Sequence, residues 1–236
     1  MEEKVSNRLS QSEIIKLSAI IGVLLLIFIY SVFSKNNFER TTFAEMTNET
    51  LDELLEPIKD NYTLTVDRKS DENVQTIEYI TDGTLKLYNE KGKENGYLVY
   101  KGKTYYVESK NTTIKVSKKN PEYMNDPLSD ITFIKKITKY CDFKDVKKTS
   151  FNCNINMKDY IEEYNVYNNT SYTYDGEEQI QFHFTHEEII NNITVDYSTL
   201  NNIMGNNKNM IYSMNISNVS ENDYSTLLEV FKNTLK

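Results

Sequence analysis

The sequence has no tryptophan, two cysteines, two histidines, three prolines and seven glycines among its 236 residues. No further Cys accompanies Cys141 and Cys153, and on a strand the only histidines, His183 and His186, would point to opposite faces, so the spacing predicts no zinc site. The glycines do not have the spacing of a dinucleotide- or phosphate-binding loop, and no serine has the glycine-flanked context of a nucleophile. We therefore expect no metal, no cofactor and no enzymatic activity.

Acidic residues outnumber basic ones by 35 to 27, which gives a formal net charge of −8. Residues 101–148 are the exception, with 12 basic and 6 acidic side chains, so the rest of the chain sums to −8 − 6 = −14. This basic segment either meets anionic lipid headgroups or cell-wall polymers, or is a solvated face around a helix. Nucleic acid is not an expected partner.

A single uncharged apolar run, Leu17–Phe33, predicts a membrane-spanning helix. As a helix it would be about 25 Å long, and extension to Ile14 and Ser34 brings it close to a bilayer core of about 30 Å. A cleaved signal peptide is the alternative, although bulky residues follow the run where small ones are usual. The basic residues that precede it favour a cytoplasmic N-terminus. We expect a tail at 1–13, a transmembrane helix at 14–34, a tether at 35–46 and an extracytoplasmic domain at 47–236.

Cys141 and Cys153 both follow the apolar run, twelve positions apart. Paired, they would close a short loop and require an oxidising compartment. The alternative is a pair of buried free thiols in a cytosolic domain. We predict the disulfide.

The rest of the chain alternates between helical and strand patterns. Leu51, Leu54, Leu55 and Ile58 have helical spacing, and from Asn61 the apolar period changes to two. Short turns join four or five strands up to residue 116, with no repeat of fixed period visible. We then expect a helix within 126–141, a strand at 150–156, a short helix, three strands and a terminal helix. This order predicts an α+β fold with a curved antiparallel sheet packed with helices.

The segment YLVYKGKTYYV, residues 97–107, predicts a hairpin with a two-residue turn at Lys101-Gly102. The turn places apolar side chains on both faces, where most hairpins have one wet face. One face would carry ligand- or helix-facing residues: Leu98, Tyr100, Tyr105 and Val107. The other would be a docking face: Tyr97, Val99 and Tyr106.

The layout of the chain consists of a tether, a helix, the tyrosine-rich meander NYTLTV…YLVYKGKTYYVES, a helical insertion and a last set of strands. It resembles that of the LolA/LppX-like envelope lipoproteins. The chain departs from them because it has no lipobox cysteine. The resemblance implies a half-barrel sheet around helices, with a cavity for lipid or acyl chains. We therefore expect a single-pass membrane protein whose domain binds lipid-like or apolar ligands in the bacterial envelope. A surface interaction module with a filled core and an envelope protein partner is the alternative.

Overall fold

The computed structural model describes residues 46–236, apart from 72, 109–112, 226–227, 230–232 and 234–236. The chain divides into two units, Met1–Glu45 and Met46–Lys236, and the first lies wholly outside the described residues. The predicted tail, transmembrane helix at 14–34 and most of the tether therefore lie outside them too. Within the part of the chain that the structure describes, no helix has the length and apolar character needed to cross a membrane.

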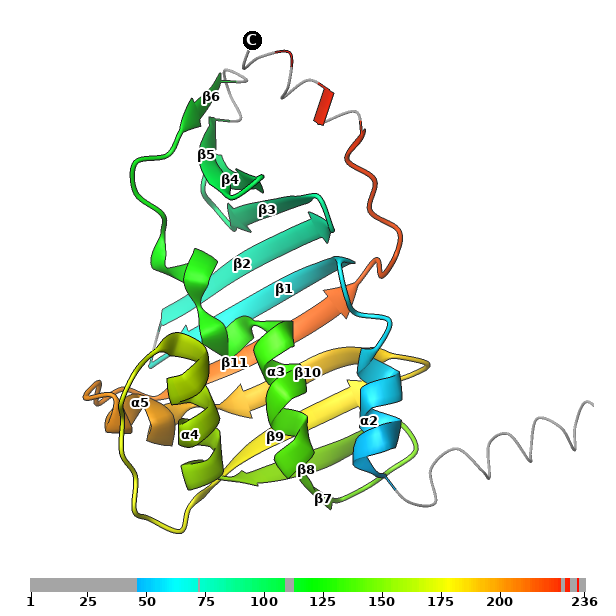
Figure 1. Ribbon diagram of the computed structural model, residues 1–236, viewed down its shortest axis with the longest axis vertical. Helices are drawn as coiled ribbons and strands as arrows, with labels where there is room; N and C mark the ends of the chain where they lie inside the picture. Colours follow the sequence, from blue (N-terminus) through cyan, green and yellow to red (C-terminus); the bar gives the residue numbers. More distant parts are fainter. Residues whose placement is uncertain (1–45, 72, 109–112, 226–227, 230–232, 234–236) are drawn as a thin grey trace, which may run out of the picture. The chain divides into compact units, whose positions relative to one another are not determined.

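The second unit is built on one antiparallel sheet in which eleven strands are described (Figure 1). The strand order is β6-β5-β4-β3-β2-β1-β11-β10-β9-β8-β7, so an N-terminal and a C-terminal meander join through β1 and β11. The strands are β1 (Asn61–Ser70), β2 (Asn73–Asp82), β3 (Leu85–Glu90), β4 (Asn95–Tyr100), β5 (Lys103–Glu108), β6 (Thr113–Val116), β7 (Asp142–Lys144), β8 (Ser150–Asn156), β9 (Gln179–His186), β10 (Ile190–Asp196) and β11 (Met210–Ser217).

The expected fold class, an α+β half-barrel packed with helices behind a transmembrane helix, is wrong. The described domain is mostly sheet, and its α-helices are only 6 to 12 residues long. The cause is visible in α3, whose apolar stripe predicted one helix within 126–141. Asp130 caps an α-helix that starts only at Ile131, and 3₁₀ turns stand on either side of it. The period of the apolar stripe predicted helical structure but not the length of the helix. Tertiary packing divides the segment into one α-helix and flanking 3₁₀ turns.

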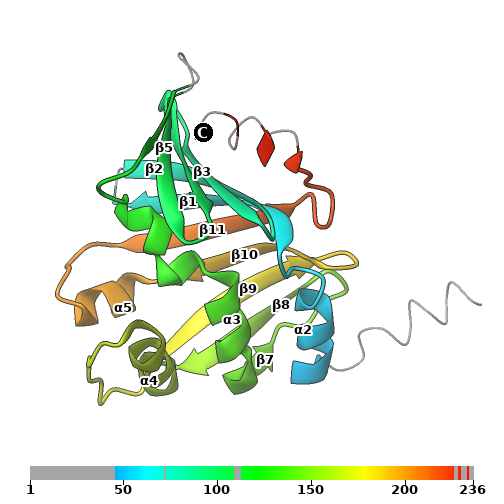
Figure 2. The ribbon, with the colours of Figure 1, turned by 45° about the horizontal axis from the view of Figure 1, so that its top comes forward.

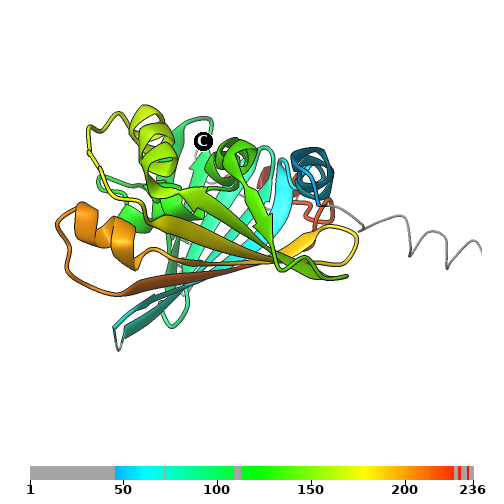
Figure 3. The same ribbon diagram turned by 90° about the horizontal axis from the view of Figure 1, so that it is seen from below.

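The helices α2, α3 and α4 lie on one face of the strands β8–β11, as the view from below shows (Figure 3). That face carries the apolar side chains of each strand, among them Phe151, Phe182, Val195 and Tyr212, which are buried. Aromatic rings fill the layer between; Phe133 of α3 packs edge-on against Tyr160 of α4, with ring centroids 5.6 Å apart. The helical elements are α2 (Asn48–Leu55), η1 (Glu122–Asn125), η2 (Pro127–Ser129), α3 (Ile131–Ile137), η3 (Thr138–Tyr140), α4 (Met157–Asn168) and α5 (Ser198–Ile203).

The predicted hairpin forms β4 and β5, and its turn is confirmed. Lys101 and Gly102 both have positive φ, 50° and 72°, as a type I′ turn requires. The turn pairs Tyr100 with Lys103 and Val99 with Thr104.

Both faces of the hairpin are covered, each by a different part of the chain. On one face Leu98 and Tyr105 are buried with Leu85, and Tyr224 and Leu228 of the C-terminal segment pack on this cluster. The other face meets the segment between β6 and α3, which passes over β1 and β2 (Figures 1 and 2). Two separate coverings thus explain why neither face of the hairpin is polar.

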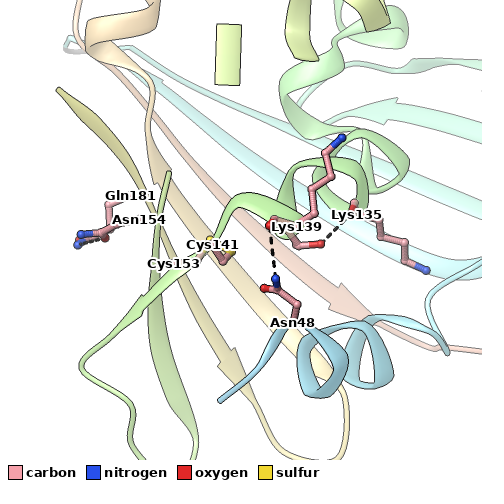
Figure 4. Close-up of a disulfide and its surroundings, with 8 residues drawn as sticks. Asn48, Lys135, Lys139, Cys141, Cys153, Asn154 and Gln181 are labelled. Carbon is pink, nitrogen blue, oxygen red and sulfur yellow. Dashed lines mark hydrogen bonds between the residues drawn. A yellow bond between two sulfur atoms is a disulfide. The ribbon is translucent and has the colours of Figure 1, made fainter. Parts of the chain in front are cut away.

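The predicted disulfide between Cys141 and Cys153 is present, with Cα atoms 4.9 Å apart (Figure 4). It ties the residue after η3 to the middle of β8, and Cys153 is fully buried. Helix α2 joins the same corner, where Asn48 Nδ2 donates to the carbonyl oxygen of Lys139 at 3.4 Å. The disulfide therefore anchors the C-terminal end of the helical insertion to the sheet.

Candidate functional site

A groove of about 560 Å³ lies on the helical side of the sheet, between strands β1–β5 and the segment that leads from β6 to α3. Its size is in the range of small-molecule sites. Its lining mixes aromatic, aliphatic and polar groups: Tyr62, Leu64, Tyr79, Ile80, Thr81, Lys86, Leu87, Tyr88, Val99, Gly102, Thr104, Asn120, Tyr123, Met124, Asn125, Asp126, Pro127, Ser129, Asp130, Tyr167 and Asn168. We call it the tyrosine groove, after the five tyrosines among these residues.

Residues 120–130 form the outer wall of the groove. Pro121 and Pro127 prevent a continuous helix here, so the chain makes two short 3₁₀ turns instead. Tyr123 and Met124 are buried against Ile77 of β2 and against β3. The hydroxyl of Tyr79 donates to the carbonyl oxygen of Tyr123 at 2.9 Å, which fixes the height of this wall above the sheet.

A buried polar network fixes the end of this wall to the sheet. The side chain of Asp126 is 8% exposed, and its Oδ2 accepts from the Tyr212 hydroxyl at 2.8 Å. Arg68 places Nη2 3.4 Å from the same oxygen, and its Nε donates to the Tyr212 hydroxyl at 2.7 Å. Burial and the nearby carboxylate of Asp126 raise the pKa of Tyr212, so this hydroxyl stays protonated and remains a donor. The charge of Asp126 is thus matched internally.

Asp130 lies at the beginning of α3 and has a different environment. Its Oδ1 accepts from the Thr132 amide at 2.8 Å, which caps the helix, and its Oδ2 accepts from the Tyr167 hydroxyl at 2.6 Å. Burial raises the pKa of both Tyr62 and Tyr88, and the negative charge of Asp130 raises both further. For Tyr167, burial and the bond to Asp130 raise the pKa to about 12. The three hydroxyls therefore stay neutral around this carboxylate.

A row of tyrosines crosses neighbouring strands on the groove side of the sheet, and two of its members, Tyr79 and Tyr88, line the groove. The register places Tyr79 opposite Tyr88, Tyr88 opposite Tyr97, and Tyr97 opposite Tyr106. The rings of Tyr79 and Tyr88 pack edge-on with their centroids 5.1 Å apart, and those of Tyr97 and Tyr106 do so with centroids 5.6 Å apart. Successive members of this row are nine positions apart in the sequence. The expectation that no fixed period exists overlooked this spacing, which a meander with equal hairpins produces.

The structure separates the two residue sets predicted on the hairpin. The first set lies on the face away from the groove: Leu98 and Tyr105 are buried there, with Tyr100 and Val107 packed against them. The second set lies on the groove side. Val99 lines the groove, and the ring of Tyr97 packs against that of Tyr123 with the centroids 6.4 Å apart.

Sequence reasoning missed Tyr62, Tyr167, Asp126 and Asp130 as site residues. Asp126 and Asp130 are each the residue before a helical turn, and their carboxylates accept from an amide two residues on. This capping pattern before an apolar stripe was a readable signal for their position. No comparable signal existed for Tyr167, because α4 meets the groove only through tertiary packing.

The two histidines lie apart. His183 is exposed and its Nδ1 is 2.7 Å from Oδ1 of Asn152, whereas His186 is buried. Among the described residues, no group of three or more Cys, His, Asp or Glu side chains lies close enough together to bind a metal ion. A search against protein-family models and a search of curated proteins both find no match for this chain.

Proposed function

We propose that this protein is a binding protein of the cell envelope, and that the tyrosine groove holds a lipid-like, partly apolar ligand without chemical turnover. The observation that carries the proposal is the groove itself. It is about 560 Å³ in volume and joins aliphatic side chains such as Leu64, Val99 and Met124 to tyrosine rings and polar groups. Such a lining suits a molecule with an apolar part and a hydrogen-bonding part.

The disulfide supports a place outside the cytoplasm for the described domain, because such bonds form and persist in oxidising compartments. The predicted membrane segment at 14–34 and the resemblance to LolA/LppX-like lipoproteins stay predictions. The groove differs from the cavity that the resemblance implies, because aromatic side chains fill the layer between α3, α4 and the sheet. The space for a ligand lies instead over the half of the sheet under residues 120–130.

Replacing Val99 with tryptophan should empty the groove. Val99 is half-buried on the groove wall, so a larger ring there occupies ligand space without entering the buried core. The full chain would be purified in a mild detergent, and bound molecules would be identified by native mass spectrometry and organic extraction. We expect a stoichiometric amphiphile on the unaltered protein and a loss of about tenfold or more in occupancy for V99W, because overlap in a close-packed site is poorly tolerated.

V166W is the matched control, since Val166 is 82% exposed on α4 and does not line the groove. It should retain the amphiphile. An unaltered protein that carries no small molecule, or a V99W variant that carries as much as V166W, would contradict the proposal.

A protein-interaction module is the second candidate function. The filled aromatic layer under α3 and α4 favours it, as does the docking face of Tyr97, Val99 and Tyr106, which is only half-buried. This candidate predicts an empty groove and an envelope protein recovered by cross-linking from Tyr97 or Tyr106.

A further inference from the structure

The tyrosine groove contains two opposite charges that the fold does not neutralise. Of the charged residues that line it, Asp126 is paired with Arg68. The other two, Asp130 and Lys86, take part in no ion pair with any residue that the structure describes. A partly enclosed carboxylate and an ammonium group that face one groove without pairing can each receive a charge from a ligand.

The surroundings of Asp130 fit a cation. Tyr167 donates to its carboxylate, and Tyr62 and Tyr88 line the same part of the groove closely enough to feel its field. Aromatic faces attract ammonium groups, and enclosed rings beside a carboxylate are a usual site for alkylated ammonium ligands. The ring of Tyr167 already has partners within the protein, the Nζ of Lys136 4.8 Å from its centre and the Phe133 ring at 5.0 Å between centroids, so a ligand's ammonium would meet the rings of Tyr62 and Tyr88.

The surroundings of Lys86 fit an anion. Lys86 is exposed and lies on the groove side of β3, with Thr81 of β2 and Val99 of β4 as its cross-strand neighbours. Neither neighbour is acidic, so an anionic group of a ligand would meet no like charge there.

We propose that the tyrosine groove recognises a zwitterionic headgroup, an alkylammonium joined by a short chain to a phosphate. The ammonium lies between Asp130 and the rings of Tyr62 and Tyr88, and the phosphate lies at Lys86. The inference rests on the proposed function, for which it specifies the class of amphiphile. An acyl chain attached to the phosphate would continue over Val99, the cross-strand neighbour of Lys86.

Two soluble probes isolate the headgroup. Phosphocholine carries both charges, and 3,3-dimethylbutyl phosphate has the same shape with a carbon in place of the ammonium nitrogen. Isothermal titration of the full chain, kept soluble in an amphipathic polymer, should show phosphocholine binding about tenfold tighter than its carbon analogue. Equal affinity for the two probes, or no binding of phosphocholine, would overturn the inference.

Charge-removing variants locate the two contacts. Asp130→Asn removes the charge but keeps the helix cap, because asparagine caps as well as aspartate. It should abolish the preference for phosphocholine over the carbon analogue. Lys86→Met should instead weaken both probes to a similar extent, because both carry the phosphate.

Asp196→Asn and Lys158→Met serve as controls. Asp196 accepts from the Ser198 amide at 2.9 Å, much as Asp130 accepts from Thr132, but it lies outside the groove, as does the exposed Lys158. Neither control should change binding. A preference that survives D130N, or that D196N removes equally, would also overturn the inference.

A third probe, dihexanoyl phosphatidylcholine below its micelle concentration, separates a lipid source of the headgroup from a free one. Tighter binding than phosphocholine supports a lipid, because the short chains then contact the aliphatic lining. If V99W fails to displace an amphiphile while phosphocholine still binds at Asp130, the proposed function fails and the headgroup site stands. If an amphiphile is displaced but phosphocholine does not bind, the inference alone fails.

Discussion

Replacing Asp126 with alanine is expected to lower the free energy of unfolding by about 3 kcal/mol, a larger effect than we expect from any other single substitution in the groove. The substitution leaves the Tyr212 hydroxyl without its acceptor and Arg68 without its carboxylate. It also removes the acceptor of the Leu128 amide, 3.1 Å from Oδ1, which begins the second 3₁₀ turn. The expected loss is at the lower end for a broken buried pair because the Arg68 side chain is 25% exposed and regains some hydration.

Urea denaturation of the full chain, followed by far-UV circular dichroism, measures this loss. D126N should cost less, about 1–2 kcal/mol, because the amide oxygen still accepts from Tyr212. Asp196→Ala is the control, since its carboxylate is exposed and accepts from the Ser198 amide at the start of α5. If D126A unfolds at the same urea concentration as D196A, the network does not hold the groove wall as described.

Removing the disulfide with the double variant C141S/C153S is expected to cost about 3 kcal/mol, from the loop-closure entropy of a short loop. The sulfur bridge is the covalent link between the helical insertion and β8, and the buried Cys153 position would receive a polar hydroxyl. Adding a strong reductant should lower the free energy of unfolding of the unaltered protein by a similar amount, and its thermal midpoint should fall accordingly. Unchanged stability after verified reduction would contradict this prediction.

The same cysteines report the compartment. Thiol labelling of intact cells should leave both cysteines unmodified until reductant is added, because each is bonded to the other. Ready labelling without reductant in the native host would mean that the bond is absent there, and the proposal of an extracytoplasmic domain would lose its support.

Local sequence patterns predicted the strands well and the architecture poorly. Alternation placed β1 to β5 and β8 to β11 within a few residues of their ends, because one buried face per strand leaves a period of two. Turn chemistry fixed the register of β4 with β5 through Lys101 and Gly102. The pairing of β1 with β11 joins segments about 150 residues apart, so no local signal indicated which two strands would join the meanders.

The candidate site was harder to predict because it is assembled from distant segments. Tyr62, Asp130 and Tyr167 come from a strand, a helix cap and the end of another helix, and only the tertiary fold brings them together. The apolar second face of the hairpin was correctly identified as unusual. The covering of the face that carries Leu98 and Tyr105 by Tyr224 and Leu228 could not be inferred, because a helical stripe at the C-terminus fits any apolar surface.

Nuclear magnetic resonance of the full chain, with carbon-13 in its tyrosine rings, tests most directly whether the tyrosine groove is the ligand site. On titration with dihexanoyl phosphatidylcholine, the account predicts shifts for the ring signals of Tyr62, Tyr88 and Tyr167. Tyr100 and Tyr105, on the opposite face of the sheet, should stay unchanged. Shifts confined to Tyr100 and Tyr105, or no shift at saturating ligand, would contradict it.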